Sequence, residues 1–159
     1  RSTLFPYTTL FRSTNLGGLD VAGQREKLGA TVERLKNASI TVSMFIDADI
    51  AQVKACAAVN ADCVEIHTGK YAEYFKKFGA DSLQFKAENG RIAEAARCAL
   101  ERGLILNAGH GLDYDNIEKI CKVPGMNEFN IGFAIIAKSV FTGLEKAVKE
   151  MKDLMAKFY

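Results

Sequence analysis

The sequence predicts an α/β fold in which strands and helices alternate around a parallel sheet. Short apolar runs, typical of buried strands, alternate with segments that have the period of amphipathic helices. Several of these runs end at glycine or aspartate, as strands do where the chain turns into a helix. The composition, with 48% hydrophobic and 25% charged residues, fits one globular domain, and no apolar run approaches the roughly 18 residues of a membrane span.

The first thirteen residues do not share this pattern. They lack the continuous apolar segment of a signal peptide, and residues 3–13 read as the direct translation of a common sequencing adaptor. We therefore expect residues 1–13 to be a non-native segment and residues 14–159 to form one domain. The segment carries Arg1 and Arg12 and no acidic residue, so the formal charge of +2 falls to zero without it. Charge then gives no support for binding to nucleic acid or to an acidic membrane.

The native part begins with a loop, a helix and a strand. Residues 14–20 contain a Gly-Gly pair and read as a loop, and residues 21–37 have a helical period with Asp20 as the expected N-cap. Residues 40–46 form an apolar, β-branched run that predicts a buried strand, and residues 50–59 predict the helix that follows it.

The next strand is expected over residues 63–67. Its alternation places Val64 and Ile66 on one face and Glu65 and His67 on the other. After it the pattern is weaker. Residues 71–78 predict a short helix, residues 79–88 a loop or a frayed extension of the next helix, and residues 92–100 an alanine-rich helix that Gly103 stops.

The last two strands enclose a short helix. A strand from Leu104 runs into the sequence Asn-Ala-Gly-His-Gly (107–111), a glycine-rich turn of the kind that joins a strand to a helix. A helix over 114–121 and a strand over 126–132 follow. The final helix is expected over 134–158, with Gly143 as a point of weakness.

Two architectures fit four consecutive strand–helix units: a small doubly wound sheet, or half of a (β/α)8 barrel, which normally needs roughly 250 residues. A nucleotide-binding open sheet has no support, because the sequence contains neither Gly-x-Gly-x-x-Gly after a first strand nor a P-loop. The scattered cysteines predict buried, reduced thiols rather than a disulfide framework. They are Cys56, Cys63, Cys98 and Cys121.

Polar side chains gather where the strands end. In a parallel sheet these ends share one edge, and chemistry concentrates there. The expected edge holds both histidines of the chain together with carboxylates and amides: Asp47, Asp49, Glu65, His67, Asn107, His110 and Asn130. Such a set can supply a general acid, a general base and electrostatic stabilisation. A metal site has little support, because neither His-x-His nor His-Glu-x-x-His occurs.

Gly111 and Gly132 lie in the last two strand–helix turns. In barrels these turns often hold a phosphate on backbone N–H groups at a helix N-terminus. Neither turn contains lysine or arginine, so a phosphate there would be held mainly by the backbone. Two ordinary turn glycines would give the same pattern.

Five motifs in order resemble those of pyridoxine 5'-phosphate synthase, the vitamin B6 enzyme of the deoxyxylulose-phosphate route. They are Gly-Gly-Leu-Asp-Val-Ala-Gly-Gln-Arg (17–25), Phe-Ile-Asp-Ala-Asp (45–49), Glu-Ile-His-Thr-Gly (65–69), Asn-Ala-Gly-His-Gly-Leu (107–112) and Asn-Ile-Gly (130–132). The resemblance extends over residues 14–157 and implies a TIM (β/α)8 barrel, of which this chain is about the second half, strands five to eight. It also implies a cytoplasmic homo-octamer that uses no nucleotide or redox cofactor.

The resemblance implies a condensation of 3-amino-2-oxopropyl phosphate with 1-deoxy-D-xylulose 5-phosphate to give pyridoxine 5'-phosphate, phosphate and water. Glu65 matches a glutamate that stabilises the transition state, and His110 matches a proton donor. Gly111 and Gly132 match positions that hold the aminoketone phosphate, and Thr14 matches a threonine that binds deoxyxylulose phosphate.

The chain departs from the family pattern in three places. Phe133 stands where some members have histidine, which is tolerable if that position binds substrate through its backbone N–H. The stretch 70–91 is a few residues longer than expected. The family's other catalytic histidine and glutamate belong to the first half of the barrel, so we expect this chain to lack synthase activity that its parent gene encodes.

Two other functions fit the pattern less well. One is another phosphate-binding barrel enzyme, such as an aldolase or epimerase, but Lys70 is the lysine nearest a predicted strand end and is poorly placed for a Schiff base. The other is a non-catalytic half-barrel that self-associates through its exposed sheet edges.

Overall fold

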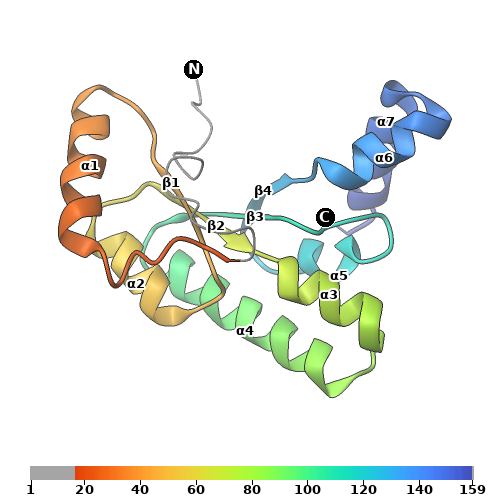
Figure 1. Cartoon of the computed structure of the whole chain (residues 1–159), viewed down its shortest axis with the longest axis horizontal. Coiled ribbons are helices and arrows are strands. Elements are labelled where there is room, and N and C mark those ends of the chain that lie inside the picture. Colours follow the sequence, from red (N-terminus) through yellow and green to blue (C-terminus); the bar gives the residue numbers. More distant parts are fainter. Residues whose placement is uncertain (1–16, 159) are drawn as a thin grey trace.

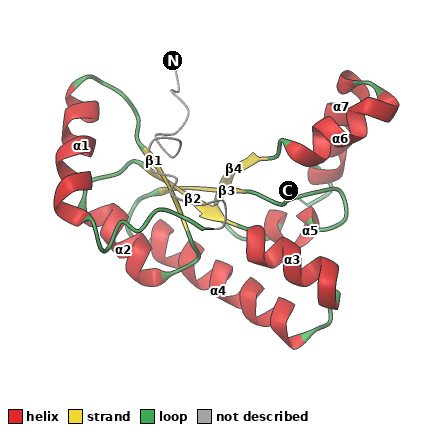
Figure 2. Cartoon of the chain, in the orientation of Figure 1, coloured by secondary structure: helices red, strands yellow, loops and turns green. Residues whose placement is uncertain are grey.

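The computed structural model of the chain describes residues 17–158 and contains one parallel sheet. The adaptor-like segment 1–13 and Thr14 lie outside the described residues. The strands follow one another across the sheet in chain order: β1 (Ser43–Ile46), β2 (Cys63–His67), β3 (Ile105–Gly109) and β4 (Met126–Asn130). Strands and helices alternate along the chain, as the sequence predicts (Figure 2).

Helices precede, connect and follow these strands. They are α1 (Arg25–Asn37), α2 (Ile50–Ala58), α3 (Gly69–Phe78), α4 (Leu83–Leu100), α5 (Ile117–Cys121), α6 (Phe133–Thr142) and α7 (Leu144–Met155). In Figure 1, α2, α3 and α4 lie along the same side of the strands, and α4 packs against both of the others. Within the described part of the chain, no helix has both the length and the apolar character needed to cross a membrane.

The strand order distinguishes the two predicted architectures. A doubly wound sheet reverses its strand order at a switch point, whereas this sheet runs β1-β2-β3-β4 without a reversal. Successive right-handed crossovers in such an order place the connecting helices on one face. The doubly wound alternative is therefore wrong for the described residues, and the arrangement is consistent with an arc of a (β/α)8 barrel.

The two faces of the sheet have different chemistry. Val64, Ile66, Leu106 and Ala108 are in register on adjacent strands and are completely buried in the apolar core beneath the helices. On the other face, Glu65 is in register with Phe45 on one side and Asn107 on the other. The alternation predicted for residues 63–67 is thus confirmed, and it directs the polar side chains away from the core.

Three predicted boundaries moved because polar side chains bind nearby backbone groups. Asp20 does not cap α1, since its Oδ1 accepts the N–H of Gly23 and closes a turn before the helix. Strand β1 begins at Ser43, because the preceding N–H of Val42 donates to Asp62 Oδ2 instead of joining a strand ladder. The region 79–88 is mostly helical, because Ser82 caps α4.

The expected single C-terminal helix is wrong. Gly143 has φ 83° and ψ 149°, a conformation that is essentially restricted to glycine, and the chain reverses there. Helices α6 and α7 then pack against each other, with Lys138 and Glu150 forming an ion pair between them. No residue of α6 is buried, so much of the predicted apolar stripe lies on the surface. The prediction for the cysteines is confirmed: all four are free and buried.

Candidate active site

The ends of the first three strands bring an aspartate and both histidines together. Asp47 follows β1, His67 ends β2, and His110 follows β3. Asp47 Oδ1 lies 3.0 Å from His67 Nδ1, and the ring centroids of His67 and His110 lie 4.8 Å apart with an angle of 55° between the planes. The predicted gathering of these three residues at one edge of the sheet is therefore confirmed.

His67 is held from several sides. Its side chain is 6% exposed, and the edge-on ring of Phe45 lies 5.1 Å away between centroids. Asp47, which holds its Nδ1, also accepts the N–H of Gly18 at 3.2 Å. The loop that contains Gly18 is fixed on the end of β1, because the N–H of Leu19 donates to the Phe45 carbonyl at 2.7 Å.

Glu65 lies over the backbone of the neighbouring strand. A Cβ atom added at Gly109 would come within 2.2 Å of Glu65 Oε1 and 3.0 Å of Asn130 Cβ. Only a glycine at position 109 leaves this space, so the motif glycine allows side chains from β2 and β4 to approach β3 from either side. Glu65 is partly exposed.

His110 has an unusual backbone conformation. Its φ is 76°, in the left-handed region that costs about 1–2 kcal/mol for a residue with a Cβ. Thr68 secures this turn. Its buried hydroxyl lies 2.8 Å from the Gly109 carbonyl and 2.7 Å from the His110 carbonyl, and its N–H donates to the Gly109 carbonyl at 2.9 Å. The backbone thus presents the exposed His110 side chain at the strand end.

Tyr71 and Asn116 stabilise the turn after His110. Gly111 has φ 80°, and its carbonyl accepts Asn116 Nδ2 at 3.0 Å. The Tyr71 hydroxyl donates to the Asn116 carbonyl at 2.6 Å, and burial raises the pKa of this tyrosine far above its usual range. Tyr71 therefore remains a neutral donor that ties the turn to α3.

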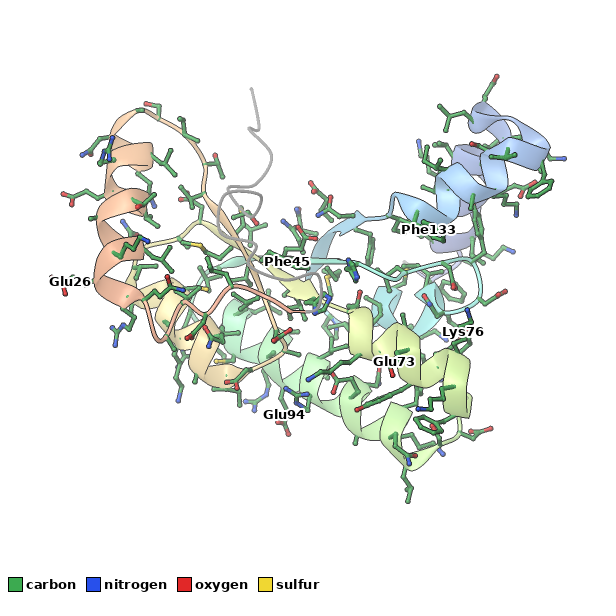
Figure 3. The ribbon with its side chains drawn as sticks, viewed as in Figure 1. Glu26, Phe45, Glu73, Lys76, Glu94 and Phe133 are labelled. Carbon is green, nitrogen blue, oxygen red and sulfur yellow. The ribbon has the colours of Figure 1, made fainter. Side chains whose placement is uncertain are left out.

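Gly132 and Phe133 lie at the next turn. Gly132 immediately precedes α6, and a Cβ placed on it would meet nothing within 4 Å. Phe133 opens the helix with its side chain 89% exposed, so its ring does not occupy the turn (Figure 3). The first N–H groups of α6 have no partners within the helix and can donate hydrogen bonds to an anion at this position.

Two residues of the predicted edge form hydrogen bonds that stabilise nearby structure. Asp49 is exposed and caps α2, accepting the N–H of Ala51 at 2.6 Å. Asn107 is 6% exposed and accepts Asn127 Nδ2 at 3.1 Å. Among residues 17–158, no three His, Cys, Asp or Glu side chains are placed to hold a metal ion. Sequence reasoning missed Thr68, although its place between His67 and a helix start was a usable signal.

The comparison with known families agrees with this geometry. A family model described as pyridoxal phosphate biosynthesis protein PdxJ matches residues 2–157. The match spans nearly the whole chain and includes every motif that forms the strand-end cluster. The chain therefore belongs to the pyridoxal phosphate biosynthesis protein PdxJ family, the family of pyridoxine 5'-phosphate synthases.

Proposed function

We propose that this chain is the second half, strands five to eight, of a (β/α)8 barrel that condenses 3-amino-2-oxopropyl phosphate with 1-deoxy-D-xylulose 5-phosphate. The observation that carries the proposal is the joint position of Glu65 and His110, which flank Gly109 at the open face of the sheet. Family membership makes pyridoxine 5'-phosphate the expected product, with release of phosphate and water.

The proposed chemistry needs a proton donor and a fixed negative charge. The substrate amine adds to the ketone of the other substrate, and loss of water from the adduct requires protonation of a hydroxyl group. We assign this protonation to the exposed imidazole of His110. We assign Glu65 to stabilisation of positive charge that develops on the nitrogen in the transition state, because an ionised carboxylate acts over short distances where water is partly excluded.

The phosphates are assigned to the backbone at two turns. Gly111 and Gly132 would receive the aminoketone phosphate, with the first N–H groups of α6 pointing at it. Phe133 would act through its backbone N–H, which agrees with the outward position of its ring. Thr14, which lies outside the described residues, would bind the deoxyxylulose phosphate.

The proposal includes a cytoplasmic homo-octamer, and helix α6 supports the self-association that such an assembly needs. Large apolar side chains cover its surface, with Val140 76% and Phe141 89% exposed. An exposed apolar surface of this kind usually meets another protein surface. Missing barrel segments and neighbouring subunits would both cover it in the complete assembly. The aldolase alternative gains no support, because Lys70 lies exposed in the first turn of α3.

We further propose that residues 1–13 are non-native, although the family match begins at residue 2, and that the 159-residue chain alone is inactive. Resequencing the locus upstream of codon 14 tests this directly. The expected result is about a hundred further in-frame codons of strand–helix pattern. A start codon just before residue 1 would refute the truncation.

An assay of the product then tests the reaction. The two substrates are incubated with the 159-residue chain and with the protein encoded by the extended gene, and pyridoxine 5'-phosphate is measured by chromatography. We expect turnover only from the longer protein. In that protein Glu65→Gln and His110→Asn should each lower kcat about 10²–10⁴-fold, as for a removed acid–base group. The matched control Glu73→Gln, an exposed glutamate on α3, should leave kcat unchanged. Turnover by the short chain, or full activity in either site variant, would contradict the assignment.

A further inference from the structure

We infer that Asp47 and His67 are positioning residues that fix the imidazole ring of His110, and that Asp47 does so by imposing one tautomer on His67. The inference rests on the proposed role of His110 as a proton donor, and it concerns two residues to which that proposal gives no task. Its basis is a continuous series of contacts from Asp47 through His67 to His110.

The first contact determines which nitrogen of His67 carries the proton. An ionised carboxylate only accepts hydrogen bonds, so Asp47 Oδ1 at 3.0 Å requires a proton on His67 Nδ1. The carboxylate is itself held in place, because the same oxygen accepts the N–H of Gly18. In its neutral form His67 therefore keeps Nε2 free of a proton, as an acceptor.

The second contact places this acceptor edge beside His110. A Cβ added at Gly69 would lie 2.6 Å from His67 Nε2 and 3.1 Å from His110 Cδ2, so both rings converge over the same glycine. The ring centroids of the two histidines are 4.8 Å apart. Because His67 is 6% exposed and bounded by Phe45, its ring is fixed, and the exposed ring of His110 packs against it.

The backbone of His110 is fixed separately, which leaves the ring torsions as its remaining freedom. Thr68 bonds to the Gly109 and His110 carbonyls and holds the left-handed turn. A proton donor has to meet its acceptor within about 0.5 Å of the productive geometry. By limiting the orientations of the His110 ring, the packed ring of His67 therefore favours proton transfer. Asp47 contributes by preventing rotation of the His67 ring.

The test uses nuclear magnetic resonance on the full 159-residue chain, which contains only two histidines. Ring ¹⁵N shifts report the tautomer of each histidine, and proton–proton Overhauser effects report the distance between the rings. In the unsubstituted chain we expect His67 as the Nδ1–H tautomer and a cross-peak between the two rings. An averaged tautomer in His67, or no cross-peak, would overturn the inference.

Three variants separate positioning from general stability. Asp47→Ala should release His67 from the single tautomer, shift the His110 ring signals and weaken the cross-peak. Asp47→Glu keeps an acceptor that cannot donate and should restore the tautomer. Asp49→Ala removes the same charge two positions away and also removes the cap of α2, so it should lower stability while leaving both rings unchanged.

The outcomes distinguish this inference from the proposed reaction, because none of the measurements needs turnover. An unchanged His67 tautomer in Asp47→Ala, or an equal disturbance in Asp49→Ala, would refute the positioning pair even if the synthase assignment holds. Conversely, the tautomer and the cross-peak can be observed in a chain that has no synthase activity.

Discussion

Replacing Gly69 by alanine should destabilise the protein, although alanine is the better helix former. Gly69 is the first residue of α3, where the change would normally favour the helix by up to about 1 kcal/mol. Here the added Cβ would lie 2.6 Å from Nε2 and 2.9 Å from Cε1 of His67. The ring has no free direction in which to move, because Asp47 holds its Nδ1 and the side chain is 6% exposed.

The size of the effect follows from the competition between the two terms. Forcing an extra carbon into a packed site costs about 1–3 kcal/mol, so the net loss in the free energy of unfolding should reach about 2 kcal/mol after a helical gain of about 1 kcal/mol. Gly90→Ala in α4 is the matched control, since its Cβ would meet nothing within 4 Å, and it should stabilise by up to about 1 kcal/mol. Urea unfolding followed by circular dichroism measures both midpoints. If Gly69→Ala stabilises the protein as Gly90→Ala does, the conclusion that the His67 ring is rigidly packed is wrong.

Three further predictions test the surroundings of the site. Tyr71→Phe should lower the free energy of unfolding by about 0.5–1.5 kcal/mol in urea titrations, because it removes the buried hydrogen bond from the Tyr71 hydroxyl to the Asn116 carbonyl; an unchanged midpoint would contradict that hydrogen bond. Burial raises the pKa of the Cys56 thiol to about 12, so its contribution to stability is complete below about pH 9 and is lost as pH rises toward 12. Iodoacetamide should accordingly label Cys56 at pH 8 only after unfolding. Rapid labelling of Cys56 in the native chain would refute its burial. Gly143→Ala should cost about 1–3 kcal/mol and weaken the pairing of α6 with α7, detected as faster amide exchange in both helices; unchanged exchange would show that the turn tolerates a side chain.

The strands and the polar edge could be predicted because their patterns are local. The strand over 63–67 has the predicted bounds, and its alternation separates Val64 and Ile66 from Glu65 and His67 as expected. Parallel pairing then places the strand ends at one edge without further assumptions. The two histidines are neighbours for this reason alone, although they are 43 positions apart in the sequence.

The errors arise where one side chain or one glycine decides between two conformations. For residues 79–88 the sequence leaves open a loop and an extension of the next helix, and Ser82 decides for the helix by capping α4. Gly143 separates α6 from α7, although the apolar period continues across it and favours one helix. Periodicity cannot distinguish a continuous helix from two helices that reverse at a glycine, because the backbone torsions at one residue decide the outcome.

The contacts explain why the motifs have to be considered as a set. The first motif provides the N–H of Gly18 to Asp47 in the second, and Asp47 in turn orients His67 in the third. The third motif also contains Thr68, whose hydroxyl holds the backbone of His110 in the fourth. A change at Asp47 is therefore expected to reach His110 through His67, whereas a change at Thr68 reaches it through the backbone. Because both routes converge on one residue, the disturbance of the His110 ring in a double variant should differ from the sum of the two single variants, as expected for residues that share a partner.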